Sequence, residues 1–164
     1  MDALKLLQDD HEAVLSLFDA YQKLGDGLSA HKTALARKIC REIELHSEIE
    51  ERVLYPELGK RRSEELRDKV REGFEEHLSA KRIIGDLRQM NAQDPQFDAK
   101  VRVLNEELEH HIKEEEDEMF PEARDLMSED QLEEIGDSMQ ALRESLEQGT
   151  AEVRPDEAAS QASV

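Results

Sequence analysis

The sequence predicts an all-α protein: an antiparallel up-down four-helix bundle with an additional C-terminal helix and a disordered tail. Charged residues make up 38% of the chain and aromatic residues only 4%, with 7 Gly and 4 Pro, which favours amphipathic helices over sheets. Apolar residues also recur at helical spacing in five segments. A length of 164 residues suits one domain with a sizeable core, so we expect these segments to pack together.

The first two predicted helices form one antiparallel pair. The first spans residues 2–24 and ends at the glycine-containing segment 25–27, because glycine favours helix termination. The second spans residues 29–58. The core-facing stripe of the first helix consists of Leu4, Leu7, His11, Val14, Leu15 and Phe18. The core-facing stripe of the second consists of Leu35, Ile39, Ile43, His46, Glu50 and Val53.

The third and fourth predicted helices form the second pair. Ser63 is the expected N-cap of the third helix, which continues to about residue 91. Asp94 is the expected N-cap of the fourth, with Pro95 at its first position. The stripe of the third helix consists of Leu66, Val70, Phe74, His77, Ile84 and Leu87. The stripe of the fourth consists of Val101, Leu104, Leu108, His111, Glu115 and Met119.

The chain divides into three parts, with the bundle in residues 1–127. Ser128 and Gln131 have the spacing of a capping box, which opens an accessory helix over residues 128–148. We expect its apolar stripe to pack on the bundle rather than form a partner surface. This stripe consists of Leu132, Ile135, Met139, Leu142 and Leu146. Residues 149–164 are polar, small and interrupted by proline, which predicts a disordered tail.

Two stretches of the chain repeat one motif. Residues 46–56 and 111–121 both read His-x-x-x-Glu-Glu-x-x-apolar-aromatic-Pro. A His and a Glu four residues apart on a helix project from one face, one turn apart, where both can bind one metal ion. A further histidine precedes each motif: His11 lies 35 residues before the first, and His77 lies 34 residues before the second. The chain therefore contains two copies of a unit with metal-binding spacing.

Six polar residues of these units lie on the predicted core-facing stripes. A buried imidazole or carboxylate is costly unless it is paired, hydrogen-bonded or bound to metal. Counted from the turns, the four histidines lie roughly 20–25 Å along their helices. In an up-down bundle with short loops, they therefore meet at similar depth. The six candidate metal ligands are His11, His46, Glu50, His77, His111 and Glu115.

These residues resemble the haemerythrin-like family, specifically its HHE cation-binding domains, over roughly residues 5–125. The family pattern is one His on the first helix, His-x-x-x-Glu on the second, His on the third and His-x-x-x-Glu on the fourth. The resemblance implies a four-helix bundle that holds two non-haem iron ions joined by an oxo or hydroxo bridge. It implies that the six candidate residues are the ligands and that Glu50 and Glu115 bridge the ions.

The chain departs from the oxygen-carrying haemerythrins in two places. Those proteins have His-x-x-x-His on the third helix, whereas the positions four residues from His77 are Gly73 and Lys81. They also have His-x-x-x-x-Asp on the fourth, whereas Glu115 and Glu116 both compete for that role here. We choose Glu115 because it matches the Glu of the first motif. Two octahedral irons then keep about two open positions instead of one, which makes simple oxygen carriage less secure.

The leading hypothesis is a non-haem di-iron protein that binds or senses oxygen or nitric oxide, or handles iron. Its partner would be a small diatomic ligand or peroxide. No general base or substrate pocket is evident, so a ligand-binding or sensing protein is favoured over an enzyme. The alternatives are a di-iron oxidoreductase acting on peroxide or nitric oxide, an iron donor for iron–sulfur repair and, third, a metal-free interaction bundle.

Two other metal sites fit the sequence less well. A ferritin-like di-iron site needs Glu-x-x-His on two helices, and Glu107 with His110 is the single pair that fits. A zinc site takes about four ligands in a tetrahedron, fewer than the six candidates.

Charge and cysteine content restrict the partners and the compartment. Lys and Arg number 22 against 41 Asp and Glu, and the net charge of −19 repels nucleic acid and attracts cations. Cys40 is the single cysteine and cannot form an internal disulfide, which suits a reducing compartment. No apolar run reaches the length of a membrane span, and no signal peptide is evident. We expect a cytoplasmic protein without a membrane partner, present as a monomer or weak homodimer.

Four neighbours of the candidate ligands have expected roles of their own. Glu51 and Glu116 lie about 100° around the helix from the ligand positions, so we expect them to support the site from outside or face solvent. Tyr55 and Phe120, the aromatic residues of the two motifs, should pack as caps at the end of the bundle.

Overall fold

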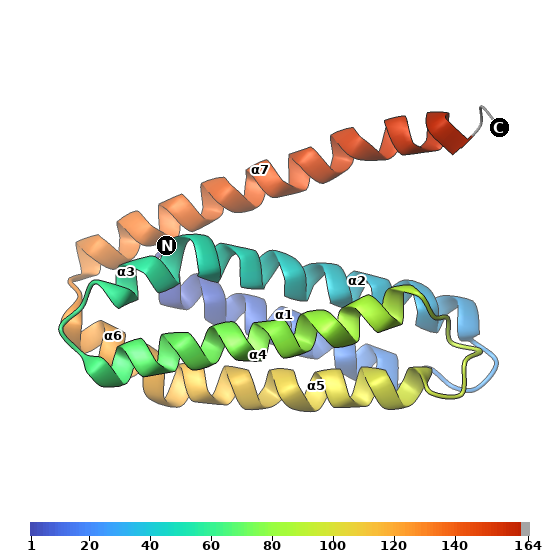
Figure 1. The fold of residues 1–164 in the computed structure, drawn as a ribbon, viewed down its shortest axis with the longest axis horizontal. Helices are drawn as coiled ribbons and strands as arrows, with labels where there is room; N and C mark the ends of the chain where they lie inside the picture. Colours follow the sequence, from blue (N-terminus) through green and yellow to red (C-terminus); the bar gives the residue numbers. More distant parts are fainter. Residues whose placement is uncertain (162–164) are drawn as a thin grey trace.

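The computed structural model describes residues 1–161, with side chains through residue 149, and is entirely helical between its turns over this range. The elements are α1 (Ala3–Gln22), α2 (Ser29–Ile49), η1 (Glu50–Leu54), α3 (Tyr55–Gly59), α4 (Glu64–Arg88), α5 (Phe97–Glu114), η2 (Glu115–Met119), α6 (Phe120–Leu126) and α7 (Glu129–Gln161). Figure 1 shows α1, α2, α4 and α5 side by side, with the chain reversing at each end. The predicted four-helix bundle with a fifth helix is confirmed.

Two serines cap helices as the sequence predicts. The Ser63 hydroxyl oxygen accepts a hydrogen bond from the Leu66 N–H at 3.1 Å. The Ser128 hydroxyl oxygen accepts from the Gln131 N–H at 3.2 Å, and Gln131 Oε1 accepts from the Ser128 N–H at 3.0 Å. These bonds satisfy donors that would otherwise be unpaired at the helix starts, which fixes where α4 and α7 begin.

The predicted N-cap at Asp94 is wrong. Helix α5 begins at Phe97 with Gln96 as its N-cap. The Asp94 carboxylate accepts from the Asn91 N–H at 2.8 Å, so it closes the preceding turn and does not cap the helix. The predicted burial of Phe74 is also wrong, since its side chain is 41% exposed. The neighbouring Gly73 takes the inward-facing position instead.

Helix α7 packs on the bundle, as its stripe predicts. It contacts α1, α2 and η1, and Leu132, Ile135 and Met139 are buried. The helix continues through residue 148 to Gln161, whereas the sequence predicts a disordered tail from residue 149. Alanine and glutamate recur in this segment and favour helix. Residues 162–164 of the predicted tail lie outside the described range. Within that range, no helix is long and apolar enough to cross a membrane.

The second and fourth bundle helices each contain one widened turn. η1 and η2 are π-helical turns that begin at Glu50 and Glu115, at the same point of the repeated motif. Each widened turn ends two residues before the motif proline, Pro56 or Pro121. A proline ring clashes with the carbonyl four residues earlier, and a wider turn relieves that clash. The repeated motif therefore fixes both the candidate ligands and the local widening beside them.

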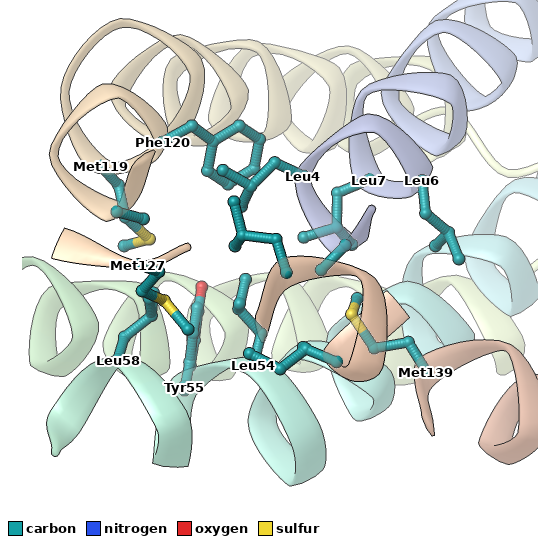
Figure 2. Close-up of a cluster of buried hydrophobic side chains, with 14 of the residues drawn as sticks. Leu4, Leu6, Leu7, Leu54, Tyr55, Leu58, Met119, Phe120, Met127 and Met139 are labelled. Carbon is teal, nitrogen blue, oxygen red and sulfur yellow. The ribbon is translucent and has the colours of Figure 1, made fainter. Parts of the chain in front are cut away.

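The apolar core has two parts separated by a polar layer. One cluster, drawn in Figure 2, includes Leu7 and Leu54, and the other includes Val14 and Ile43. Each histidine on a core stripe lies between a residue of one cluster and a residue of the other. On α1, for example, His11 lies between Leu7 and Val14. The polar layer is thus enclosed by hydrophobic packing at both ends.

Candidate metal centre

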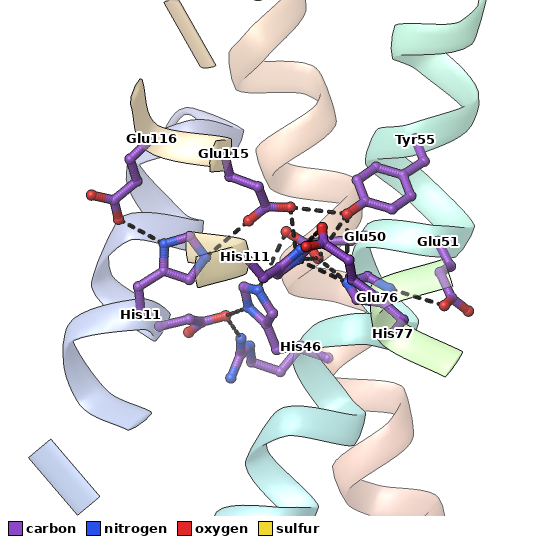
Figure 3. Close-up of polar contacts among 12 residues, drawn as sticks. His11, His46, Glu50, Glu51, Tyr55, Glu76, His77, His111, Glu115 and Glu116 are labelled. Carbon is purple, nitrogen blue, oxygen red and sulfur yellow. Dashed lines mark hydrogen bonds and ion pairs between the residues drawn. The ribbon is translucent and has the colours of Figure 1, made fainter. Parts of the chain in front are cut away.

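All six candidate ligands meet in the polar layer. Their exposed fractions range from 0% for Glu50 to 7% for His46, so each is buried. The four histidines come from α1, α2, α4 and α5, and the two glutamates open the π-helical turns. Figure 3 shows these side chains converging from the surrounding helices. The wide turns aim both carboxylates into the centre of the bundle.

The six residues form two half-sites that share both carboxylates. In half-site 1, His11 Nε2 lies 3.2 Å from Glu115 Oε2, and His46 Nε2 lies 3.3 Å from Glu50 Oε1. In half-site 2, the other oxygens of the same two glutamates take part. His77 Nε2 lies 3.0 Å from Glu50 Oε2, and His111 Nε2 lies 3.1 Å from Glu115 Oε1. In each half-site, one ligand atom from each of the four residues can face a single ion.

The donor atoms of half-site 1 fit a metal ion. His11 Nε2, His46 Nε2, Glu50 Oε1 and Glu115 Oε2 are buried and lie in pairs at 3.2 and 3.3 Å, but among the described residues none of them has a hydrogen bond of good geometry. Buried polar atoms left in this way cost free energy. An ion bound among two imidazole nitrogens and two carboxylate oxygens would satisfy all four together. The arrangement therefore fits the metal that the ligand spacing predicts.

An outer ring of carboxylates holds the four imidazoles. We call Asp10, Glu51, Glu76 and Glu116 the outer carboxylates. The Nδ1 atoms of His11, His77 and His111 lie 2.7, 2.9 and 2.9 Å from their carboxylate oxygens, and that of His46 lies 3.3 Å away. A carboxylate there fixes the proton on Nδ1 and turns Nε2 towards the centre, the usual arrangement for a metal-binding histidine.

The outer ring also separates Glu115 from Glu116. Glu115 is buried and reaches Nε2 atoms, whereas Glu116 contacts the Nδ1 side of His11 and is 33% exposed in its side chain. The structure thus places Glu115 inside the centre. It places Glu116 behind a candidate ligand, and Glu51 has the matching place behind His77. Glu51 and Glu116 therefore support the site from outside, as the sequence predicts, whereas the third outer glutamate, Glu76, was not predicted.

The charges in the centre shift one another's pKa values. Burial alone would lower the pKa of His46, but the Glu50 carboxylate and the contact with Asp10 outweigh burial and raise that pKa to about 10. Burial raises the pKa of Glu50, but His46 and the other imidazoles lower it well below its usual range. Without metal, the His46 imidazole is therefore protonated and pairs with the ionised Glu50 carboxylate.

The comparisons with known proteins place the chain in a family. The model of the Hemerythrin HHE cation binding domain matches residues 2–123. The chain belongs to this family. A crystal structure of a haemerythrin HHE cation-binding domain-containing protein from Mycobacterium kansasii has the same fold, with a TM-score of 0.75. Its sequence is 22% identical, and the match covers 88% of this chain and 86% of that one.

A curated relative shares sequence with the HHE domain but is a longer protein. A DNA nickase from Nostoc sp. (strain PCC 7120) is 26% identical over 148 residues. The match takes in 90% of this chain, which spans 41% of the length of that relative.

Within this HHE domain, Tyr55 reaches the candidate metal centre, a contact that the sequence did not reveal. Its ring packs in an apolar cluster, as predicted for a cap, but its hydroxyl donates to Glu115 Oε1 at 2.9 Å. The hydroxyl also lies 3.5 Å from Glu50 Oε2 and from His77 Nε2. Burial, with the charges of both glutamates, raises the pKa of Tyr55 well above its usual value. Half-site 2 thus has a neutral phenol beside it.

Gly73 makes room for this phenol. A Cβ at position 73 would lie 2.5 Å from the Tyr55 hydroxyl oxygen. Position 73 is four residues before His77, one of the two places where the oxygen-carrying haemerythrins would have a further His. The other motif has Phe120 where this one has Tyr55, and Phe120 stacks on His11 at 6.0 Å between ring centroids. The sequence contains one sign of the Tyr55 contact: at the aromatic position of the repeated motif, one copy has Tyr and the other has Phe, so only one copy carries a hydroxyl.

Proposed function

We propose that the HHE domain holds two non-haem iron ions and binds or senses oxygen or nitric oxide. The observation that carries this proposal is that each of the two carboxylates has one oxygen in each half-site. Glu50 and Glu115 each direct one oxygen to half-site 1 and the other to half-site 2. Carboxylates in this position would bridge two ions, and two ions would account for six buried ligand groups that converge at one place.

The ligand types favour iron. Imidazole and carboxylate donors suit iron in mixed nitrogen and oxygen sites. Four histidines and two bridging carboxylates exceed the roughly four ligands of a tetrahedral zinc site. A bound iron pair would supply the capacity to exchange electrons with oxygen, nitric oxide or peroxide. The protein residues hold the ions in a dry layer between two apolar clusters.

The two half-sites differ in access, which supports an external ligand at half-site 1. A cavity of about 270 Å³ borders His11 and His46, and its walls combine apolar side chains such as Val14 and Leu17 with charged ones such as Arg143. A far smaller cavity of about 20 Å³ borders His77 and three other residues of the centre and its outer ring, namely His46, His111 and Glu76. The larger cavity would bring a diatomic molecule as far as the imidazoles of half-site 1, whereas Tyr55 already lies beside half-site 2.

Metal analysis tests the proposal. Apoprotein reconstituted with ferrous iron without oxygen should bind two ions per chain, and the air-exposed protein should show near-ultraviolet absorption from ferric iron. The variants His46→Ala and His111→Ala should each lose iron, whereas His110→Ala, an exposed neighbour, should keep both ions. A wild-type protein that retains no iron after reconstitution would exclude the proposal. Anaerobic titration with oxygen and nitric oxide then identifies the ligand by reversible spectral change.

A second candidate, an oxidoreductase acting on peroxide, is favoured by Tyr55. A buried phenol that donates to Glu115 can deliver a proton beside the centre. Stopped-flow mixing with excess hydrogen peroxide separates the two functions. Continued turnover that slows in Tyr55→Phe supports the oxidoreductase, and a single stoichiometric reaction supports a binding or sensing protein.

The nickase relative does not supply a function for this domain. Its match spans 41% of the longer protein, so the DNA-directed activity in its name can belong to the remainder. A net charge of −19 also opposes contact with a phosphate backbone. We therefore propose a small molecule, not nucleic acid, as the partner.

A further inference from the structure

Helix α7 is fixed against the start of α1. Met139 is completely buried in this contact. Gly136 lies so close to the chain start that a Cβ there would collide with the carbonyl oxygen of Met1. Side chains four residues apart share one face of a helix, so the register that buries Met139 also directs Arg143 towards the bundle.

Arg143 meets a carboxylate of the metal centre. Its guanidinium donates to Asp10 Oδ2, and the same oxygen lies 3.3 Å from His46 Nδ1. The side chains of Arg143 and Asp10 are 16% and 20% exposed, so solvent screens this pair less than a fully exposed one. Guanidinium, carboxylate and imidazole form a continuous chain of contacts from α7 through α1 to α2.

Asp10 differs from the other three outer carboxylates. The oxygens of the other three lie 2.7 to 2.9 Å from the Nδ1 atoms of their histidines. The Asp10 oxygen lies 3.3 Å from His46 Nδ1, the longest of the four distances. Asp10 also precedes His11 on α1, so its carboxylate must be directed across to a histidine on α2. A second anchor on this carboxylate restricts its freedom. That anchor comes from α7, beyond residue 123, where the family match ends.

We propose that Arg143 is a positioning residue, which holds Asp10 against His46 and thereby makes α7 a determinant of metal retention in half-site 1. The inference rests on the proposed function, since it concerns one of two bound ions. Loss of an outer partner of a metal-binding histidine weakens metal affinity by about 10- to 100-fold. Arg143 contacts the outer carboxylate and not the histidine itself. Its loss should therefore weaken metal retention by about tenfold, the lower end of this range.

The test measures iron release from the full chain, loaded anaerobically with ferrous iron, into a ferrous chelator. In Arg143→Gln, one of the two ions should leave about tenfold faster than in wild type, while the other leaves at the wild-type rate. Arg143→Lys keeps the charge and should restore most of the retention. Arg124→Gln is the matched control, because Arg124 also pairs with an aspartate of the N-terminal segment, Asp2, at 3.3 Å. It should release both ions at wild-type rates.

A double variant separates positioning from the other ways in which Arg143 can act. Arg143 also borders the larger cavity, so its removal can widen the path to half-site 1. If it acts through Asp10, Arg143→Gln should add nothing in an Asp10→Asn background. A further acceleration there, equal acceleration of both ions, or unchanged release in Arg143→Gln would overturn the inference. In each case a wild-type protein with two ions per chain leaves the proposed function standing.

Discussion

The hydroxyl of Tyr55 lies 2.9 Å from Glu115 Oε1, in a space that is open because residue 73 is glycine. This contact joins the two motifs of the chain, since Tyr55 ends the first and Glu115 belongs to the second. It also makes the half-sites unequal. The equivalent aromatic residue beside half-site 1, Phe120, has no group that can donate to a carboxylate.

Tyr55→Phe should destabilise the metal-free protein by about 1.5–3 kcal/mol, the usual value of a hydrogen bond to a charged group. Urea unfolding of the apoprotein measures this loss. Iron stoichiometry should stay at two ions, because the hydroxyl is not one of the six proposed ligands. Tyr21→Phe is the matched comparison, because it removes a hydrogen bond to another carboxylate, Asp98, far from the centre, and it should lower stability by a similar amount. An apoprotein with unchanged stability would mean that the contact with Glu115 is not formed in solution.

Gly73→Ala should displace the Tyr55 hydroxyl and cost about 1–3 kcal/mol from overpacking, reduced by the better helix propensity of alanine. Gly85→Ala on the same helix should instead stabilise the protein, because nothing lies within 4 Å of a Cβ at that position. Thermal unfolding of the two variants should show Tm shifts of opposite sign. Adding Tyr55→Phe to Gly73→Ala should recover part of the loss, and strictly additive effects would contradict the contact.

Glu115→Gln should reduce iron to one ion or none per chain, because this side chain has an oxygen in each half-site. Glu116→Gln should keep two ions with weaker retention, since Glu116 contacts His11 from the outside. Iron analysis after passage over a chelating column compares the two variants directly. Equal iron loss from both would show that the adjacent glutamates share the bridging role.

Metal binding should release protons, and the stabilisation by metal should grow with pH. The pKa of His46 is raised to about 10 in the metal-free fold, so its stabilising effect is complete below the unfolded pKa and is lost as pH rises through the folded one. Metal binds the deprotonated imidazole and must displace that proton. From about pH 6 to about pH 9, the Tm of the apoprotein should fall while the increase in Tm on metal addition becomes larger.

Calorimetry in buffers of different ionisation enthalpy counts the released protons directly. If metal binds at neutral pH and no protons are released, His46 is not protonated in the apoprotein and the prediction is wrong.

The sequence by itself determined the bundle and the six residues that meet in it. Helical spacing of apolar residues depends on local periodicity, and so does the placement of His46 and Glu50 on one face. The matched motifs and turn positions then predict a common depth for all four histidines. These features could be predicted because each follows from spacing along the chain. The mistaken N-cap at Asp94 shows the limit of such local rules, because a competing turn took the carboxylate.

The tertiary structure alone decided the contacts made across helices. The place of the Tyr55 hydroxyl depends on the close approach of α4 at Gly73, and that of Arg143 depends on the angle at which α7 meets α1. The pairing of each imidazole with its outer carboxylate likewise joins residues as far apart as His11 and Glu116. Side-chain directions between packed helices are set by interdigitation of whole surfaces, and spacing along one helix carries no information about them.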